Sequence, residues 1–120
     1  MEDKSRLLLM LYDGAIGFLS RAIEALEAGG SDEVGQLIVR AQGIISELKG
    51  ALDMKYEVAQ SLCQLYDYFN RRLTEANAGK DSLPVCEVQG YLKELREAWS
   101  EAAVRVGGTT APPSVAGMGG

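Results

Sequence analysis

Residues 7–19 read LLLMLYDGAIGFL, and the expected fold is organised around this stretch. From here to residue 26, apolar side chains recur at steps of three and four, the spacing of one face of an α-helix. These positions are Leu8, Leu11, Ala15, Leu19, Ala22 and Leu26. Residues 7–11, however, are apolar around the whole helix, and one core can cover only part of that ring. We expect another element of the chain, or another protein, to cover the rest.

Three further amphipathic segments follow with the same helical spacing. Their apolar stripes are Val34, Leu37, Ile38, Ala41, Ile45, Leu48 and Leu52; then Val58, Leu62, Leu65, Phe69, Leu73 and Ala76; then Val85, Val88, Leu92, Leu95, Trp99, Ala102 and Val106. Connections of only a few residues favour antiparallel neighbours. The sequence therefore predicts an all-α fold, an antiparallel up-down four-helix bundle that spans residues 1–106 as one domain.

Capping and turn residues mark the expected helix ends. Ser5 and Asp53 are expected to cap the first and third helices, because short polar side chains accept hydrogen bonds from the free N–H groups of a first turn. Gly29-Gly30 and Gly79 should end those same helices. Pro84 suits the first turn of the fourth helix, where its missing N–H group costs nothing.

After residue 106 the composition changes to glycine, alanine, threonine and proline. Residues 107–120 read GGTTAPPSVAGMGG. Such a segment has too little apolar area to offset the entropy lost on ordering. We expect it to be a disordered C-terminal tail.

The charge balance narrows the choice of partners and of compartment. Lysine and arginine number 12 against 17 aspartate and glutamate residues, which gives a formal net charge of −5. Acidic residues spread along the chain argue against a nucleic acid or an anionic membrane surface as partner. The short apolar stretch after Glu2 and Asp3 is neither a signal peptide nor a membrane span. We expect a cytoplasmic protein without membrane insertion.

Catalytic and metal-binding patterns are missing from the sequence. The chain has no histidine, so Glu-x-x-His metal sites and His-assisted nucleophiles are excluded. Cys63 and Cys86 are too few for a zinc site or a disulfide framework, and we expect both to be reduced. Single glycines scattered inside helices form no phosphate-binding loop. We expect no metal, no cofactor and no enzyme activity.

One enzymatic alternative stays open at this point. Arg71 and Arg72, with Arg40 or Lys93, can gather around an anionic substrate in a small helical enzyme. Arginines on the outer face of a helix are more often solvated or paired with surface carboxylates. A second alternative is an adaptor that self-associates as a weak homodimer through residues 7–11.

Four stretches resemble the FliS family of flagellin export chaperones. They are LMLYDGAIGFL at residues 9–19, LKGALDM at 48–54, LYDYFNRRLTEAN at 65–77 and LKELREAWSEA at 92–102. The resemblance covers about residues 7–105, with these stretches in family order and at family spacing. It implies a cytosolic chaperone that binds the C-terminal segment of flagellin in a largely extended, partly helical form. Such a chaperone prevents premature polymerisation and presents its client to FlhA, the export gate protein of the flagellar type III apparatus.

The helical wheels indicate where a partner segment would bind. Leu9, Met10 and Ile16 are apolar positions at or beyond the edge of the core face of the first helix. Tyr12 lies on that core face, and its hydroxyl needs a hydrogen-bond partner. The candidate partner-binding residues are Leu9, Met10, Tyr12, Ile16, Val39, Gly43, Ser46, Tyr56, Tyr66, Asn70 and Asn77. Of Tyr66 and Tyr68, only one can face the core, and we expect Tyr68 to be the more exposed.

Small uncharged residues form one flank of the second helix. They are Gly35, Val39, Gln42, Gly43, Ser46 and Gly50. Each interior glycine costs about 1 kcal/mol relative to alanine, so three on one helix call for an explanation. One explanation is tolerated weakness or close packing against a neighbouring helix. The other is a groove floor at which a partner segment approaches the backbone.

Overall fold

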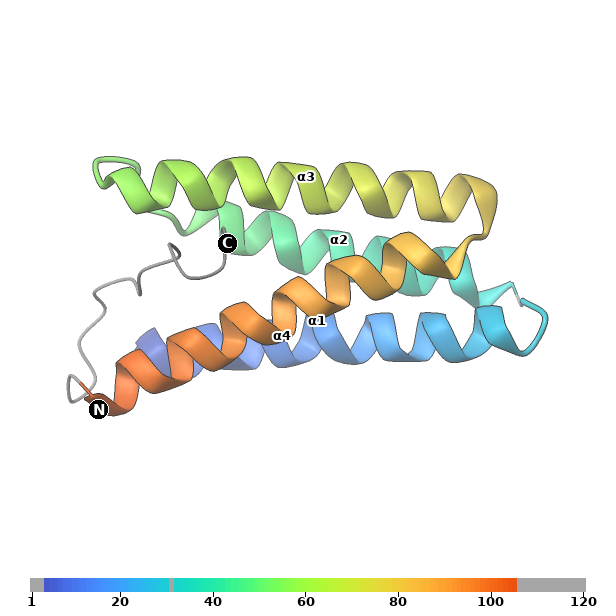
Figure 1. The fold of residues 1–120 in the computed structure, drawn as a ribbon, viewed down its shortest axis with the longest axis horizontal. Helices are drawn as coiled ribbons and strands as arrows, with labels where there is room; N and C mark the ends of the chain where they lie inside the picture. Colours follow the sequence, from blue (N-terminus) through green and yellow to red (C-terminus); the bar gives the residue numbers. More distant parts are fainter. Residues whose placement is uncertain (1–3, 31, 106–120) are drawn as a thin grey trace.

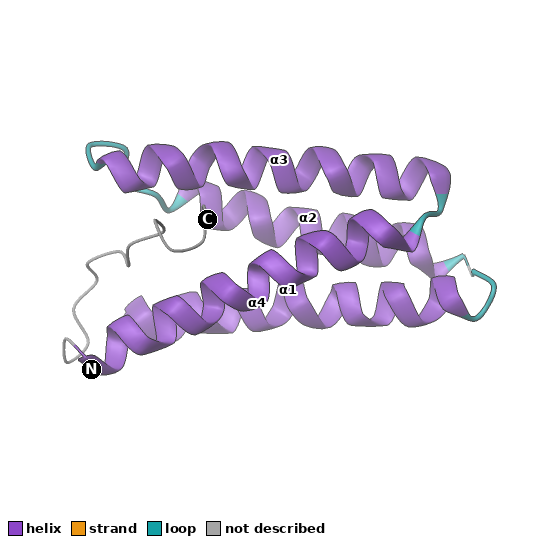
Figure 2. Ribbon diagram, viewed as in Figure 1, coloured by secondary structure: helices purple, strands orange, loops and turns teal. Residues whose placement is uncertain are grey.

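A computed structural model describes residues 4–30 and 32–105, with side chains described as far as residue 102. It contains four α-helices and, within those residues, no strand (Figure 2). They are α1 (Lys4–Glu27), α2 (Glu33–Gly50), α3 (Glu57–Gly79) and α4 (Ser82–Arg105). The predicted all-α class and the number of helices are confirmed. The tail predicted at 107–120 lies outside the described residues.

The helices alternate in direction along the bundle (Figure 1). α1 packs against α2 and α4, and α3 packs against the same two helices from the opposite corner. The α1–α2 and α3–α4 connections lie at one end of the bundle. The start of α1, the α2–α3 connection and the end of α4 lie at the other end (Figure 1). This is the predicted up-down-up-down arrangement.

The core is built from the predicted stripes, but several stripe residues are only half-buried. Outside α1 these are Leu52, Val58, Leu65, Trp99 and Ala102. Ala15, Leu19 and Ala22 are fully buried, but Leu8, Leu11 and Leu26 are half-buried at the edge of the core. The buried apolar residues of the other three helices are Val34, Leu37, Ile38, Ala41, Ile45 and Leu48; Ala59, Leu62, Tyr66, Phe69, Leu73 and Ala76; Val85, Val88, Leu92 and Leu95. Tyr12 is also fully buried. The buried stripe of α1 therefore begins with an aromatic residue.

The glycine pair after α1 ends that helix as predicted. Gly29 and Gly30 have φ values of 107° and 84°, in the left-handed region that favours glycine. The Gly30 N–H donates to the Ala25 carbonyl (2.7 Å) and the Gly29 N–H to the Leu26 carbonyl (3.2 Å). This Schellman arrangement satisfies carbonyls that the last turn leaves free.

Two predicted helix caps are wrong by a few residues, whereas the predicted end of α3 is confirmed. α1 begins at Lys4, so Ser5 lies inside its first turn and is not its cap. α3 begins at Glu57, and Asp53 instead accepts a hydrogen bond from the Lys55 N–H within the α2–α3 connection (3.2 Å). α3 ends at Gly79, and the left-handed residue that follows it is Lys80 (φ 50°). Local capping preferences are weak enough for the packing of the helices to shift the start of a helix.

Three aromatic side chains form a hydrogen-bonded group inside the bundle. The hydroxyls of Tyr12 on α1 and Tyr66 on α3 share a hydrogen bond, and Trp99 Nε1 on α4 donates to the Tyr12 hydroxyl (3.0 Å). Burial raises the pKa of both tyrosines, so both hydroxyls stay protonated. The Tyr12 hydroxyl thus has the hydrogen-bond partner that the sequence analysis expected. Trp99 itself is half-buried, less than its place in the α4 stripe predicted.

Removing one hydroxyl of this group tests its contribution. Tyr66→Phe leaves the Tyr12 hydroxyl with Trp99 alone, and we expect the free energy of unfolding to fall by about 1 kcal/mol. Chemical denaturation monitored by circular dichroism measures the change. The control is Tyr56→Phe, because Tyr56 is 49% exposed. Equal stability of the Tyr66→Phe variant and the parent would contradict a stabilising role for the buried hydroxyl pair.

A polar cluster joins α3 to α4 nearer the surface. The Tyr68 hydroxyl and Arg72 Nε both donate to Glu87, at 2.6 and 2.8 Å. Arg72 also donates to Glu75 (2.6 Å). The Tyr68 hydroxyl, with help from the Arg72 guanidinium, holds the pKa of Glu87 below its usual range. Tyr68 is half-buried, more exposed than Tyr66 as the sequence predicted.

The lowered pKa makes the contribution of Glu87 depend on pH. A carboxylate that binds its proton less tightly in the folded state stabilises the fold above its unfolded pKa of about 4.3 and loses that effect as the pH falls through the lower folded value. We therefore expect Glu87→Gln to be less stable than the parent near neutral pH. The difference should shrink as the pH falls below about 4. Denaturant titrations across this range would show it, and a difference independent of pH would contradict the assignment.

Candidate functional site

Large apolar side chains are exposed at the end of the bundle where α1 begins. Leu7 and Met10, in the first turns of α1, are 56% and 59% exposed. Met54 and Tyr56, in the α2–α3 connection at the same end, are also exposed (Figure 1). We call these four residues the apolar end. The ring predicted at residues 7–11 is therefore covered only in part, since Leu8, Leu9 and Leu11 are half-buried.

A second candidate surface follows the line where α2 meets α3. We define the α2–α3 flank as Gly35, Val39, Gln42, Gly43 and Ser46 on α2 with Asn70, Thr74 and Asn77 on α3. Val39 is 57% exposed, and Gly43 and Ser46 are also exposed. Asn70 and Asn77 are half-buried beside them. Small or uncharged side chains thus line this surface, as the sequence predicted.

Hydrogen bonds hold the middle of the flank together. Gln42 Nε2 donates to the Asn70 backbone carbonyl and to Thr74 Oγ1, both at 2.9 Å. Asn70 Nδ2 donates to Ser46 Oγ (3.3 Å). One turn away, Lys80 Nζ donates to Asn77 Oδ1 (2.5 Å). The structure therefore brings Ser46 and Asn70 together, while Asn77 is held by the end of its own helix.

One acceptor in this flank is not used by the bundle. Asn70 Oδ1 is buried and accepts no hydrogen bond, the only side-chain oxygen or nitrogen of that kind in the described part of the chain. A buried polar atom without a partner costs about 1–3 kcal/mol. The flank therefore retains the capacity to accept a hydrogen bond.

Two of the predicted partner-binding residues are buried in the core, and two others on α1 are half-buried. Tyr12 and Tyr66 are 0% and 1% exposed and face each other in the core. Leu9 and Ile16 are half-buried, and Ile16 packs against the core. In this conformation Tyr12 and Tyr66 support the surface from below and offer no area to a partner. A helical wheel shows the direction in which each of these side chains points. It does not show how deeply the side chain is buried, because burial depends on how closely α1 and α3 face each other.

The glycines of α2 differ in their surroundings. A Cβ atom at Gly35 would lie 3.5 Å from Asn77 Oδ1, an ordinary contact. At Gly43 and Gly50, a Cβ atom would have no neighbour within 4 Å. The tight position is Gly14 on α1, where a Cβ atom would lie 3.2 Å from Ile44 Cδ1. Close helix packing therefore explains a glycine at position 14, and it does not explain Gly43.

This contrast predicts the effects of two alanine substitutions. Gly43→Ala adds a Cβ atom in open space, and we expect it to raise the free energy of unfolding by about 0.5–1 kcal/mol through better helix propensity. Gly14→Ala should gain less, because Ile44 must move to make room. Thermal and denaturant unfolding of both variants would compare them. Destabilisation by Gly43→Ala would place this glycine in a helix contact that the structure does not show.

The arginines do not gather into an anion site. Arg72 is occupied by Glu75 and Glu87 between α3 and α4. The Arg71 guanidinium lies over the Tyr68 ring, 5.5 Å from its centre. Arg40 projects from α2 toward α1, where it lies over Phe18. Arg71 and Arg72 lie beside the Tyr68–Glu87 pair, whereas Arg40 lies between α2 and α1. The three arginines therefore do not converge on one substrate site, as the enzymatic alternative needs.

The described residues form no metal site. Within residues 4–30 and 32–102, no three histidine, cysteine, aspartate or glutamate side chains are placed to hold a metal ion. Cys63 is half-buried and Cys86 is exposed, and both are free thiols. No helix among the described residues is long and apolar enough to span a bilayer.

Two glutamines were missed by reasoning from the sequence. Gln42 was predicted to lie in the flank, but its hydrogen bonds to two residues of α3 were not predicted. Gln89 is buried and donates to the Ile16 carbonyl (3.2 Å) and to Ser20 Oγ (2.6 Å), joining α4 to α1. The available signal was the position of Gln89 next to Val88 in the α4 stripe, where a polar side chain needs a partner.

Comparisons with known proteins agree with this geometry. The sequence profile of the family described as "Flagellar protein FliS" matches residues 1–106. The chain is 38% identical over 96 residues to "Flagellar secretion chaperone FliS" of Bacillus subtilis, covering 80% of this chain and 72% of that protein. It is 40% identical over 99 residues to the protein of the same name from Salmonella typhimurium, covering 80% and 73%. It is 38% identical over 96 residues to "Flagellar secretion chaperone FliSB" of Pseudomonas aeruginosa, covering 78% and 76%.

Proposed function

Because this chain belongs to the FliS family, we propose that it is a flagellar secretion chaperone whose client is the C-terminal segment of newly made flagellin. The observation that carries the proposal is the family match over residues 1–106, which includes the whole described bundle. The chaperone binds its client in the cytoplasm and prevents premature polymerisation. This role requires no catalytic group and no cofactor.

The exposed surfaces suit a client of this kind. An amphipathic helix or an extended strand binds through apolar anchors and through main-chain hydrogen bonds. The apolar end offers Met10 and Tyr56 as anchors, and the α2–α3 flank offers Val39. Gly43 and Ser46 let a client backbone approach α2, and the unused acceptor on Asn70 suits a client N–H group. We assign client binding to these two surfaces.

Calorimetric titration tests the proposal directly. The full chain is titrated with a peptide of about forty residues from the C-terminus of flagellin of the same organism, long enough to lie across both surfaces. We expect one peptide per chain and a negative heat-capacity change, since apolar area is buried on binding. A scrambled peptide of equal composition is the control. Absence of binding by the native peptide would overturn the proposal.

A matched pair of leucine substitutions locates the binding surface. Gly43→Leu fills the α2–α3 flank with an isobutyl group, and we expect the affinity for the flagellin peptide to fall by at least about tenfold, equivalent to about 1.4 kcal/mol. Gly17→Leu on α1 is the control, because Gly17 is also exposed with open space around its Cβ position. Both variants should remain folded by circular dichroism. Full affinity of a folded Gly43→Leu variant would exclude the flank as the client site.

Delivery and self-association complete the proposal. We expect the chaperone–flagellin complex to bind the export gate protein FlhA more tightly than either component does alone.

Without client, the apolar end also supports a weak homodimer, because exposed apolar area drives association. Light scattering with and without the flagellin peptide shows whether the apolar end binds the client or a second copy of the chain. A dimer that persists at saturating peptide would show that the apolar end is not a client site.

A further inference from the structure

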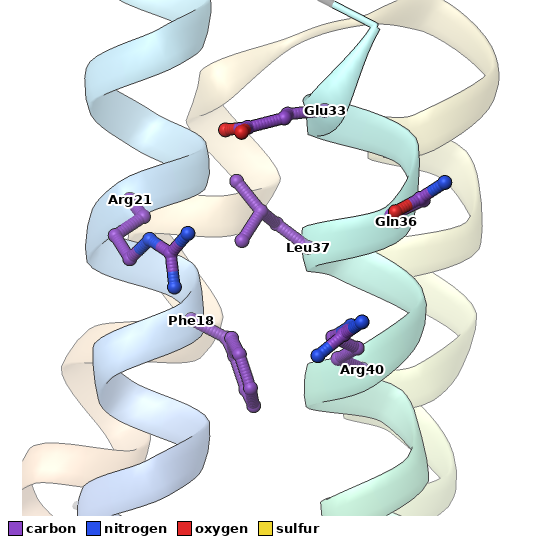
Figure 3. Close-up of a pocket in the computed structure, with 6 residues that line it drawn as sticks. All are labelled: Phe18, Arg21, Glu33, Gln36, Leu37 and Arg40. Atoms are coloured by element: carbon purple, nitrogen blue, oxygen red, sulfur yellow. The ribbon is translucent and has the colours of Figure 1, made fainter.

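A hollow between α1 and α2 has no role in the proposed client binding. Its volume is about 170 Å³. Phe18 and Arg21 of α1 and Glu33, Gln36, Leu37 and Arg40 of α2 line it (Figure 3). None of these lining residues belongs to the α2–α3 flank or to the apolar end. The hollow is therefore a separate surface from those assigned to the client.

Two arginines at this hollow have no ion-pair partner in the part of the chain that the structure describes. Elsewhere Arg72 pairs with Glu87 and Arg96 with Asp13, each at 2.8 Å. Among the described residues, no carboxylate lies within ion-pair distance of Arg21 or Arg40. This is notable in a chain that carries 17 acidic residues and a net charge of −5.

The arrangement around the two guanidinium groups is partly fixed. The Arg40 guanidinium lies over the Phe18 ring, 5.9 Å from its centre, which restricts its side chain. Figure 3 shows the Arg21 and Arg40 guanidinium groups on the two sides of the hollow, with Phe18 and Leu37 between them. Glu33 is the one carboxylate in the lining, and it lies at the end near the start of α2. The lining thus carries two positive charges against one negative charge, opposite in sign to the whole chain.

This chemistry identifies the class of occupant. Guanidinium groups bind carboxylates through paired N–H···O hydrogen bonds, and Arg is the residue best suited to that geometry. The half-buried Phe18 ring, which lies under Arg40, suits contact with the carbon atoms that accompany a carboxylate in a polypeptide. A free small anion would interact only with the two guanidinium charges, and an ion pair exposed to solvent contributes little binding free energy. We infer that the hollow is a second docking site, which binds a glutamate or aspartate side chain of an acidic segment in a protein partner other than flagellin.

The probe for this site is a short capped peptide in which glutamate and leucine alternate. Its control replaces every glutamate with glutamine. Binding to the full chain is followed by NMR at the Nε–Hε groups of the arginines. We expect the glutamate peptide to shift the Arg21 and Arg40 signals and the glutamine peptide to leave them unchanged. Equal shifts with free glutarate would overturn the inference, because they would indicate an anion site that needs no polypeptide.

Matched arginine variants complete the test. Arg21→Gln and Arg40→Gln should each weaken binding of the glutamate peptide by about threefold or more, the scale of one partly exposed ion pair. Arg71→Gln on α3 is the control and should leave binding unchanged, since Arg71 lies over Tyr68 and outside the hollow. All three variants should bind the flagellin peptide like the parent. Loss of flagellin binding by Arg21→Gln or Arg40→Gln would assign the hollow to the client and overturn a separate docking site. Unchanged binding of the glutamate peptide by both variants would also overturn it.

Discussion

The buried contact between the hydroxyls of Tyr12 and Tyr66 constrains the whole bundle. These residues come from α1 and α3, whose backbones are not neighbours among the described residues, so only long side chains connect them across the core. A hydroxyl buried without a partner is costly, and each tyrosine supplies the partner of the other. Trp99 adds α4 to the same group through its ring N–H. The axial register of α1, α3 and α4 is therefore constrained by one hydrogen-bonded group inside an apolar core.

Part of the outer face of α2 carries little side-chain bulk. Gly43 and Ser46 are exposed there, and a Cβ atom at Gly43 would have no neighbour within 4 Å. Helix propensity is lost at such positions, and proteins often accept that loss where function needs it. The flank is uncharged at its centre, whereas Lys49 and Asp67 form an ion pair farther along α2 and α3 (2.7 Å). A client segment would thus meet small and uncharged groups between charged margins.

Charged side chains act here as connections between helices. Arg96 of α4 donates to both carboxylate oxygens of Asp13 on α1, and Arg72 connects α3 with Glu87 of α4. Such partly exposed pairs contribute little stability, but they consume the cations that an anion-binding enzyme would need. Among the described residues, no carboxylate pairs with Arg21 or Arg40, which line the hollow between α1 and α2.

The sequence by itself determined the four helices, their antiparallel order and most of the buried stripe, because helical periodicity sorts apolar from polar residues without reference to any partner. It also determined the left-handed turn at Gly29-Gly30, where local sterics decide. Only the tertiary structure decided that Tyr66 is buried against Tyr12 and that Arg40 is left unpaired beside Phe18. A helical wheel gives the direction of a side chain, whereas burial and pairing depend on the distance and rotation of the facing helix, which packing alone sets.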